Sequence, residues 1–341
     1  MEVFSDFGRP ARASLYAVAG RLLFVECREQ QLAKLIEGLF DGWFLTKVSF
    51  SPKHPDVSIR FHCRETPPQI PRGLNHFDVA EGGHCYTDGI AYYLDLDNSL
   101  MLIDQGDDAV RVDVWLRRCP DFPDAPLARA TSFAVCAALR RCGLFELHSA
   151  GVASPDEKIG ALIIGPSGSG KSTLTLQLAA AGWRYLSDDE LLLSLAADHV
   201  EARGFRRFFA ITGNTAAAAG GLRQFDKVVS RGGNIPDSKT CFEPQTVFPS
   251  AQIESVVPRL LLFSSLSRTP DTRLLELSQA ETMKRLIRSC PWATYDMFVA
   301  AENLDVLSRL ARQSRSFDLL AGADLLRRNH ASDFLSAYVT H

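Results

Sequence analysis

The sequence lacks the features that mark several classes of protein. Its net charge is only −3, from 37 basic and 40 acidic residues, which gives no reason to expect a nucleic acid or an acidic membrane as a partner. No apolar run approaches the ~20 residues of a transmembrane helix, and the opening MEVFSDFGRP lacks the apolar core of a secretory signal. These absences favour a cytoplasmic protein whose partners are neither nucleic acids nor membranes.

The cysteines follow no metal-binding or redox pattern. None of them forms a Cys-x-x-Cys pair, and their spacing fits no zinc site. An even number leaves disulfides open, but scattered cysteines in a chain of 341 residues are more typical of buried, reduced thiols. The eight cysteines are Cys27, Cys63, Cys85, Cys119, Cys136, Cys142, Cys241 and Cys290.

Length and patterning indicate two domains. The chain is long enough for two domains of ordinary size, and 46% of its residues are apolar, which suffices for a substantial core. Residues 1–125 contain short alternating runs such as VSIRFHC (57–63), which predict a strand-rich α+β domain. We expect this domain to have an accessory or recognition role, although none of its residues identifies one. The proline-rich stretch CPDFPDAP (119–126) is the predicted boundary. Strand and helix patterns alternate across 126–341, which predicts an α/β domain.

One segment of the second domain has the pattern of a phosphate-binding loop. Gly165, Gly170, Lys171 and Ser172 fit Gly-x-x-x-x-Gly-Lys-Ser/Thr, between the apolar run ALIIG and a leucine-rich helix pattern. This context favours a nucleotide site over a chance match in a Gly/Ser turn. The predicted nucleotide-binding residues are Gly165, Pro166, Ser167, Gly168, Ser169, Gly170, Lys171, Ser172 and Thr173.

Each residue type in this loop has a chemical reason. The glycines permit close approach of the backbone, and amide groups at the start of a helix can surround a phosphate. Lys171 can neutralise the β and γ phosphates, and the Ser172 hydroxyl can ligate Mg²⁺. The loop therefore predicts a nucleoside triphosphate, without specifying the reaction.

Two adjacent aspartates follow the loop at a chemically useful distance. Asp188 and Asp189 lie 16 and 17 residues after Ser172, which leaves room for a helix, a turn and a strand beside the strand that precedes the loop. Near the terminal phosphate, one carboxylate can hold the metal and the other can accept a proton from an attacking hydroxyl. Adjacent strand residues face opposite ways, so both can serve the site only if the strand ends or bends there. The alternative is a solvated turn.

A histidine lies on the strand predicted just upstream. His148 belongs to FELHSAGV, which precedes the strand that leads into the loop. A neutral imidazole at this place can orient an acid or a water molecule. A single histidine on a strand is more often a packed or surface residue.

With these residues in view, residues 145–210 resemble the catalytic domain of bacterial HPr kinase/phosphorylase. The matching segments are HSAGV at His148, GPSGSGKST at 165–173, AAGW at 180–183 and the Asp188-Asp189 pair. EARGF (201–205) is similar to the family's Glu-x-Arg-Gly signature. The resemblance implies a PEP-carboxykinase-like P-loop kinase core over residues 126–341, with ATP and Mg²⁺ as cofactors.

The resemblance also implies a role for each matching side chain. Ser172 and Glu201 would hold Mg²⁺, and Asp189 would be the base that takes the proton from the acceptor hydroxyl. Asp188 would support the metal or the geometry, and His148 would assist. The catalytic residues so implied are Asp189, Asp188, His148 and Lys171.

The family's Asp-Arg-Leu-Gly segment, which carries an active-site arginine, has no clear counterpart in this chain. The glycine-rich polar stretch VSRGGNIPDSKT offers Arg231 and Lys239 as candidate lid cations. An ordinary surface loop is an equal alternative for this stretch.

These observations favour an ATP- and Mg²⁺-dependent kinase that phosphorylates a serine of a peptide or protein. Stand-alone members of the family include kinases of the C-terminal serine of lasso-peptide precursors, so the resemblance implies that substrate as one choice. Kinases of free serine or another small molecule are an alternative. A nucleotide-dependent switch or binding module is another alternative, and it would tolerate replacement of Asp189. An oligomer is left open.

Overall fold

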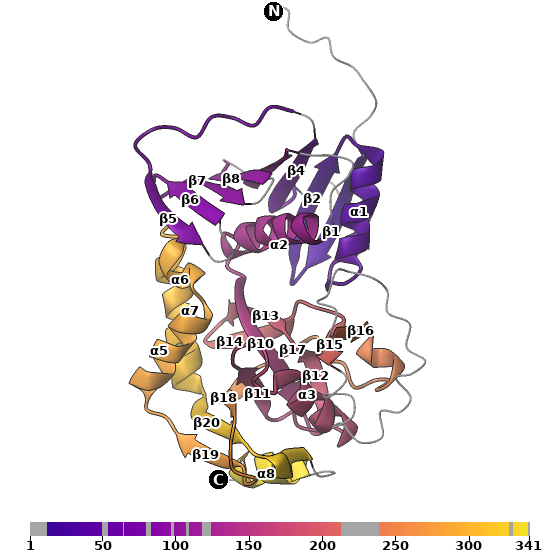
Figure 1. The fold of residues 1–341 in the computed structure, drawn as a ribbon, viewed down its shortest axis with the longest axis vertical. Coiled ribbons are helices and arrows are strands. Elements are labelled where there is room, and N and C mark those ends of the chain that lie inside the picture. Colours follow the sequence, from indigo (N-terminus) through magenta and orange to yellow (C-terminus); the bar gives the residue numbers. More distant parts are fainter. Residues whose placement is uncertain are drawn as a thin grey trace, which may run out of the picture. The chain divides into compact units, whose positions relative to one another are not determined.

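The chain forms two compact units, residues 1–142 and 143–341 (Figure 1). The computed structural model describes residues 12–49, 54–63, 65–79, 83–96, 99–106, 109–117, 124–212, 239–326 and 330–339.

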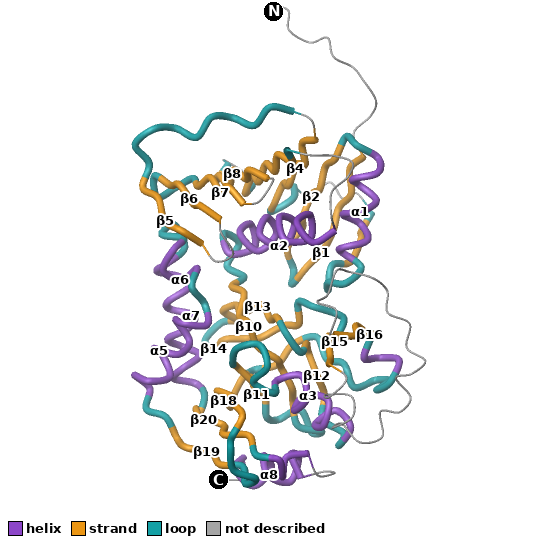
Figure 2. The backbone as a smooth tube through the Cα atoms, viewed as in Figure 1, coloured by secondary structure: helices purple, strands orange, loops and turns teal. Residues whose placement is uncertain are grey.

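The first unit is built on one nine-stranded sheet (Figure 2). Several of its strands alternate between buried and more exposed side chains, as expected for a sheet covered on one face. In spatial order the strands are β3 (Thr46–Val48), β1 (Arg12–Val18), β2 (Arg21–Cys27), β4 (Val57–Cys63), β9 (Val110–Leu116), β8 (Ser99–Gln105), β7 (Tyr92–Leu96), β6 (Gly83–Thr87) and β5 (Asn75–Val79).

Two helices pack within this unit, and the second belongs to it although the predicted domain boundary would assign most of that helix to the other unit. Helix α1 (Gln30–Phe40) contacts β2, and helix α2 (Asp124–Arg140) contacts β4, β8 and β9. Leu127, Ala134 and Leu139 of α2 are buried. The sequence analysis placed the boundary between residues 125 and 126, which lie in the first turn of α2. Because the apolar side of α2 packs on the first sheet, the first unit instead extends to Cys142.

The second unit contains a mixed nine-stranded sheet with helices on both faces. Eight of its strands follow one another in a single spatial order, and the ninth, β12, pairs with β10 outside that order. Strands β11, β18 and β20 run parallel, and the apolar runs of β11 and β18 suit strands that are covered on both sides. In spatial order the strands are β17 (Ser255–Val256), β14 (His199–Gly204), β13 (Glu190–Ala196), β10 (Phe145–Ala153), β11 (Gly160–Ile164), β18 (Pro258–Leu266), β20 (Arg315–Ala321) and β19 (Arg273–Glu276).

The two faces of this sheet belong to separate hydrophobic clusters. Helices α3 (Lys171–Ala180) and α8 (His330–Val339) pack into one cluster. The helices of the opposite cluster are α5 (Gln279–Ser289), α6 (Trp292–Tyr295) and α7 (Ala300–Gln313).

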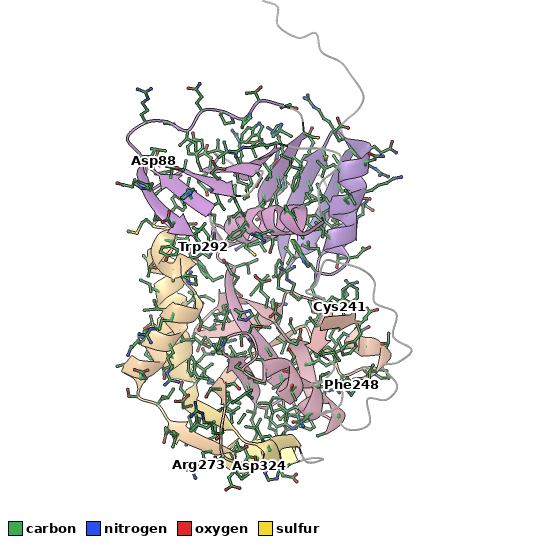
Figure 3. All side chains as sticks on the ribbon, in the orientation of Figure 1. Asp88, Cys241, Phe248, Arg273, Trp292 and Asp324 are labelled. Atoms are coloured by element: carbon green, nitrogen blue, oxygen red, sulfur yellow. The ribbon has the colours of Figure 1, made fainter. Side chains whose placement is uncertain are left out.

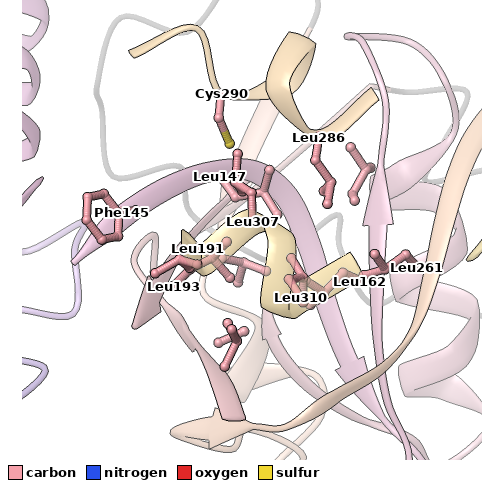
Figure 4. Packing of buried hydrophobic residues seen from close by; sticks show 14 of the residues in the cluster. Phe145, Leu147, Leu162, Leu191, Leu193, Leu261, Leu286, Cys290, Leu307 and Leu310 are labelled. Atoms are coloured by element: carbon pink, nitrogen blue, oxygen red, sulfur yellow. The ribbon is translucent and has the colours of Figure 1, made fainter. Parts of the chain in front are cut away.

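Strand β11 supplies side chains to both clusters. Ala161 and Ile163 belong to the α3 side, while Leu162 belongs to the α5 side. Figure 4 shows Leu162 and Leu261 in the same cluster as Leu286 of α5. Each fully buried leucine contributes about 1.5–3 kcal/mol of transfer free energy. The strand that leads into the phosphate-loop motif is therefore anchored from both sides.

A separate two-stranded sheet and short 3₁₀ helices complete the second unit. Phe209 and Phe242 of this small sheet pack edge to face and belong to the α3-side cluster. Figure 3 labels Cys241 on the same ribbon. The strands are β15 (Phe209–Thr212) and β16 (Lys239–Phe242), and the 3₁₀ helices are η3 (Pro244–Thr246) and η4 (Ala323–Leu326).

Strand β12 (Arg184–Ser187) is not where the sequence spacing predicts it. It pairs with β10 rather than with β11, because both edges of β11 are already paired, with β10 and β18. Strand β10 has nine residues, so β13 pairs along its first half and β12 along its second half. The prediction of β12 beside β11 is therefore wrong.

Among the described cysteines, one departs from the reduced state that the sequence predicts. Cys63, at the end of β4, is disulfide-bonded, whereas Cys27, Cys85, Cys136 and Cys290 are buried thiols in the reduced state. In the part of the chain that the structure describes, no helix is both long and apolar enough to cross a membrane.

Candidate functional site

The glycine-rich loop (165–170) joins the end of β11 to the start of α3, as the motif predicts. A Cβ atom on Gly165 would lie 2.6 Å from both the Ser169 hydroxyl and the Ser264 carbonyl oxygen, so a side chain does not fit there. Gly168 and Gly170 have φ angles of 81° and 93°, in the region that favours glycine. The loop thereby turns tightly and presents backbone amides at the first turn of α3.

Lys171 is the first residue of α3, and its side chain is held inside the loop. Its Nζ donates to the carbonyl oxygens of Gly165 at 2.7 Å and Pro166 at 3.1 Å, and it lies 3.0 Å from Nε2 of His148. The residue is 6% exposed. A buried ammonium at the first turn of a helix is suited to bind an incoming anion, because the two opposite charges attract each other strongly where water is excluded.

The aspartate pair occupies a break between two strands. β12 ends at Ser187 opposite Gly151, and β13 begins at Glu190 opposite His148, so the pair interrupts the ladder along β10. The chain bends at these two residues, and their side chains differ in exposure: Asp188 is buried and Asp189 is half exposed. The bend that the sequence analysis required for both carboxylates to serve one site is present in the structure.

Asp188 points into the protein. It is 1% exposed, its Oδ2 accepts a hydrogen bond from the Ala210 amide at 3.3 Å, and the Ser172 hydroxyl also hydrogen-bonds to its carboxyl group. Burial, and then the charge of Asp189, raises the pKa of Asp188 from its ordinary value of 3.8 to about 7. Nothing in the described part of the chain hydrogen-bonds to its buried Oδ1.

Asp189 points the other way and is half exposed. Its Oδ1 lies 3.4 Å from Nδ1 of His148. The other imidazole nitrogen, Nε2, faces the Lys171 ammonium, which can only donate, so Nε2 is the acceptor and Nδ1 carries the proton. One imidazole thus links the lysine of the loop to an accessible carboxylate. We call Lys171, His148 and Asp189 the Lys–His–Asp chain.

The oxygen atoms around Asp188 fit a magnesium ion. Mg²⁺ prefers oxygen ligands and is commonly held by one or two protein groups together with substrate phosphates. Ser172 and Asp188 supply two such groups, and the unpartnered Oδ1 of Asp188 is an oxygen that a cation would satisfy. Among the described residues, no cluster of three His, Cys, Asp or Glu side chains could hold a metal without such help.

The structure does not bring Glu201 to these groups. Glu201 lies opposite Ser194 on β13, four positions beyond Glu190 and so about 13 Å along the strand. Its carboxylate accepts from Arg203 and from Ser255, both at 2.6 Å. Its oxygen atoms are thus occupied by an arginine and a serine away from the aspartate pair, and the assignment of Glu201 to the metal finds no support in this geometry.

Neither of the two predicted lid cations has a described side chain. Arg231 is outside the described residues. Lys239 is the first residue of β16, opposite Thr212, and its side chain is not described. Their role in a lid stays a prediction.

Sequence reasoning missed several arginines near the site. Arg206 donates to Glu190 at 2.8 Å, and Glu190 is the cross-strand neighbour of His148. Arg285 and Arg288, on α5, line a cavity of about 460 Å³ that His148 and the glycine-rich loop also line. The only sequence signal for α5 is an amphipathic pattern, which does not show where its polar face lies in space.

Comparisons with known proteins include a distant structural likeness. No protein-family model matches the chain, and no curated protein matches it. Among solved structures, the Hpr(Ser) kinase/phosphatase from Coxiella burnetii is similar over 57% of this chain and 97% of that chain, with 13% sequence identity and a TM-score of 0.32.

The raised pKa of Asp188 predicts a pH-dependent stability. The folded state keeps the Asp188 proton up to about pH 7, whereas the unfolded chain releases it near the ordinary value of 3.8. Stability should therefore fall as the pH rises between these values. Asp188→Asn removes this dependence, so the nucleotide-free variant should be more stable than the wild type by about 2–4 kcal/mol at alkaline pH.

Urea denaturation of both proteins in EDTA, across this pH window, measures the difference. EDTA removes divalent cations that would favour the ionised carboxylate. Curves for the two proteins that stay parallel from acid to alkaline pH would contradict the burial argument.

Proposed function

We propose that this protein is an ATP- and Mg²⁺-dependent kinase that transfers the γ-phosphate to a serine hydroxyl. The observation that carries the proposal is the Lys–His–Asp chain: an accessible carboxylate, Asp189, is linked through His148 to the lysine of a phosphate-loop motif. The likeness of the sequence to HPr kinase/phosphorylase points to the same chemistry.

The proposed reaction is a direct displacement. The acceptor oxygen forms a bond to the γ-phosphorus, the bond from that phosphorus to the bridging oxygen breaks, and ADP leaves. The proton of the hydroxyl passes to a carboxylate oxygen of Asp189, which the Nδ1 proton of His148 orients. Lys171 moves from the loop carbonyls to the phosphates and neutralises their charge.

Asp188 and Ser172 are the groups that would hold Mg²⁺. When bound, the ion neutralises charge on the phosphate oxygens. Occupancy of this place would satisfy the buried Oδ1 of Asp188, and it requires that carboxyl group to be ionised. The buried aspartate would therefore serve the metal, and the exposed one would serve the proton.

The family resemblance suggests the chemical identity of the acceptor. It is a serine of a peptide or protein, and the C-terminal serine of a ribosomal lasso-peptide precursor is one such substrate. The first unit would recognise that substrate, and the reaction would take place in the cytoplasm, without nucleic acid or membrane partners. The cavity beside the loop favours a second candidate, a small molecule such as free serine, because its size suits a small acceptor.

Incubation with γ-labelled ATP, Mg²⁺ and a panel of serine peptides and free L-serine tests the proposal. We expect a mass increase of one phosphate on the acceptor, detected by mass spectrometry, and formation of ADP. Nucleotide binding without transfer to any acceptor would favour a nucleotide-dependent switch and overturn the kinase proposal.

A further inference from the structure

A cavity of about 460 Å³ lies in the second unit between the glycine-rich loop and helix α5. Gly165, Pro166 and His148 line it, and His148 also belongs to the Lys–His–Asp chain. Volumes of this order are typical of sites for small ligands. It is large enough for one amino-acid residue with its immediate neighbours, and too small for a folded protein partner.

One arginine forms a fixed wall of this cavity. Arg285 donates to both carboxylate oxygens of Asp318, at 2.7 and 3.1 Å, and to Glu281 at 3.0 Å. Its guanidinium also lies 5.5 Å from the centre of the Phe263 ring. Its charge is thus compensated and its position is held by several contacts, so Arg285 shapes the cavity rather than supplying free charge to it.

A second arginine leaves the cavity with an unbalanced positive charge. Arg288 follows Arg285 by one helical turn on α5 and lines the same cavity. It is exposed, and in the described part of the chain it pairs with no carboxylate. Asp318, the lining carboxylate, is already bound to Arg285. Two arginines and one aspartate leave the lining with a net charge of +1.

The cavity lies on the face of the sheet opposite α3. Ile164 and Phe263, which line it, belong to the cluster that contains α5, whereas the leucines of α3 belong to the other cluster. A triphosphate bound by the first turn of α3 would approach the loop from the α3 side. In phosphoryl transfer the attacking oxygen enters roughly in line with the leaving oxygen. A pocket across the loop from α3, adjoining His148, is placed for the attacking molecule.

We infer that this cavity binds the phosphate acceptor and that Arg288 binds a carboxylate of that acceptor. The inference rests on the proposed kinase function and narrows its substrate to a hydroxy acid, in which a free carboxylate lies close to the reacting hydroxyl. A free amino acid and the C-terminal residue of a peptide both present this chemistry. A serine inside a peptide chain does not.

Matched acceptors test the inference. The peptide Gly-Gly-Ser is offered as the free acid and as the C-terminal amide, beside free L-serine, with ATP and Mg²⁺. We expect the wild type to prefer the acid over the amide by roughly 10- to 100-fold in kcat/KM, from the loss of a charge-assisted hydrogen bond. The ratio of activity on L-serine to that on the peptide acid distinguishes the two sources of the carboxylate.

Arg288→Ala should abolish this preference. Its KM for the acid should rise roughly 10- to 100-fold, while kcat and the KM for ATP stay within about threefold. Lys284→Gln is the matched control, because Lys284 is a cation of the same helix that does not line the cavity. Equal use of acid and amide by the wild type overturns the inference and leaves the kinase function standing. A rise in the KM for ATP alone assigns the cavity to the nucleotide and also overturns it.

Binding separates this inference from the function on which it rests. O-methylserine peptides cannot accept a phosphate, so calorimetric titration of their acid and amide forms measures carboxylate recognition without turnover. Tighter binding of the acid that is lost in Arg288→Ala supports the carboxylate site even where no transfer occurs. Equal binding of both forms to the wild type contradicts it.

Discussion

Asp189→Asn is expected to lower kcat for phosphoryl transfer by roughly 10²- to 10⁴-fold, the usual contribution of a general base. Asparagine keeps the shape of the side chain but cannot take the proton of the acceptor hydroxyl. The dissociation constant for ATP should change by less than about threefold, because Asp189 is half exposed and faces His148 rather than the loop amides. Turnover with labelled ATP and titration with a non-hydrolysable nucleotide measure the two quantities.

Asp198→Asn is a matched control for this change. Asp198 is 96% exposed and also contacts a histidine, His199, at 3.1 Å, but in the turn between β13 and β14. The control variant should keep wild-type turnover and nucleotide affinity. Wild-type turnover in Asp189→Asn would exclude the carboxylate as the base. Loss of nucleotide binding together with turnover would assign it to binding instead.

The local elements of the second unit follow from sequence patterns, because each depends on neighbours in the chain. The apolar run before Gly165 predicts a buried strand, and the structure has β11 there. The leucine-rich pattern after the loop predicts a helix that stops near Gly182, and α3 ends at Ala180. Gly182 itself has a φ of 91°, which explains why a glycine follows the helix.

The placement of strands does not follow from such patterns. β12 is a mostly buried strand of sequence RYLS, but nothing in those residues specifies β10 as its partner in place of β11. Pairing is decided by which edges remain open once the rest of the sheet has formed. The break at Asp188 and Asp189, which directs one carboxylate inward and the other outward, is a consequence of that pairing.

Strand register and long-range packing determine where Glu201 and Arg288 lie, and neither can be inferred from local sequence patterns. Glu201 was assigned through a short signature, yet its distance from the aspartates depends on how β14 is aligned with β13. Arg288 comes close to the loop only because α5 covers the sheet beside β18. A helical pattern with a charged face is usually a solvated surface, so the sequence offers no reason to choose this arginine.

The second large effect concerns Lys171. Lys171→Met keeps most of the aliphatic stem but removes the ammonium group that donates to Gly165 and Pro166. We expect nucleotide affinity to fall roughly 100- to 1,000-fold, because charge-assisted hydrogen bonds to two phosphates are lost. Transfer should then be undetectable at ordinary ATP concentrations. Titration with a fluorescent ATP analogue measures the affinity directly.

A buried lysine also affects folding, so the variant needs a control for structure. Its circular dichroism spectrum and thermal transition, recorded without nucleotide, show whether the fold is kept. Lys158→Met, in the turn between β10 and β11, removes a lysine that is 79% exposed and should leave affinity unchanged. A folded Lys171→Met protein that binds ATP as tightly as the wild type would exclude the glycine-rich loop as the triphosphate site. Weak binding that high ATP concentrations overcome, without recovery of turnover, would place the ammonium group in the transfer step as well, since charge on the γ-phosphate oxygens must be stabilised as the bond breaks.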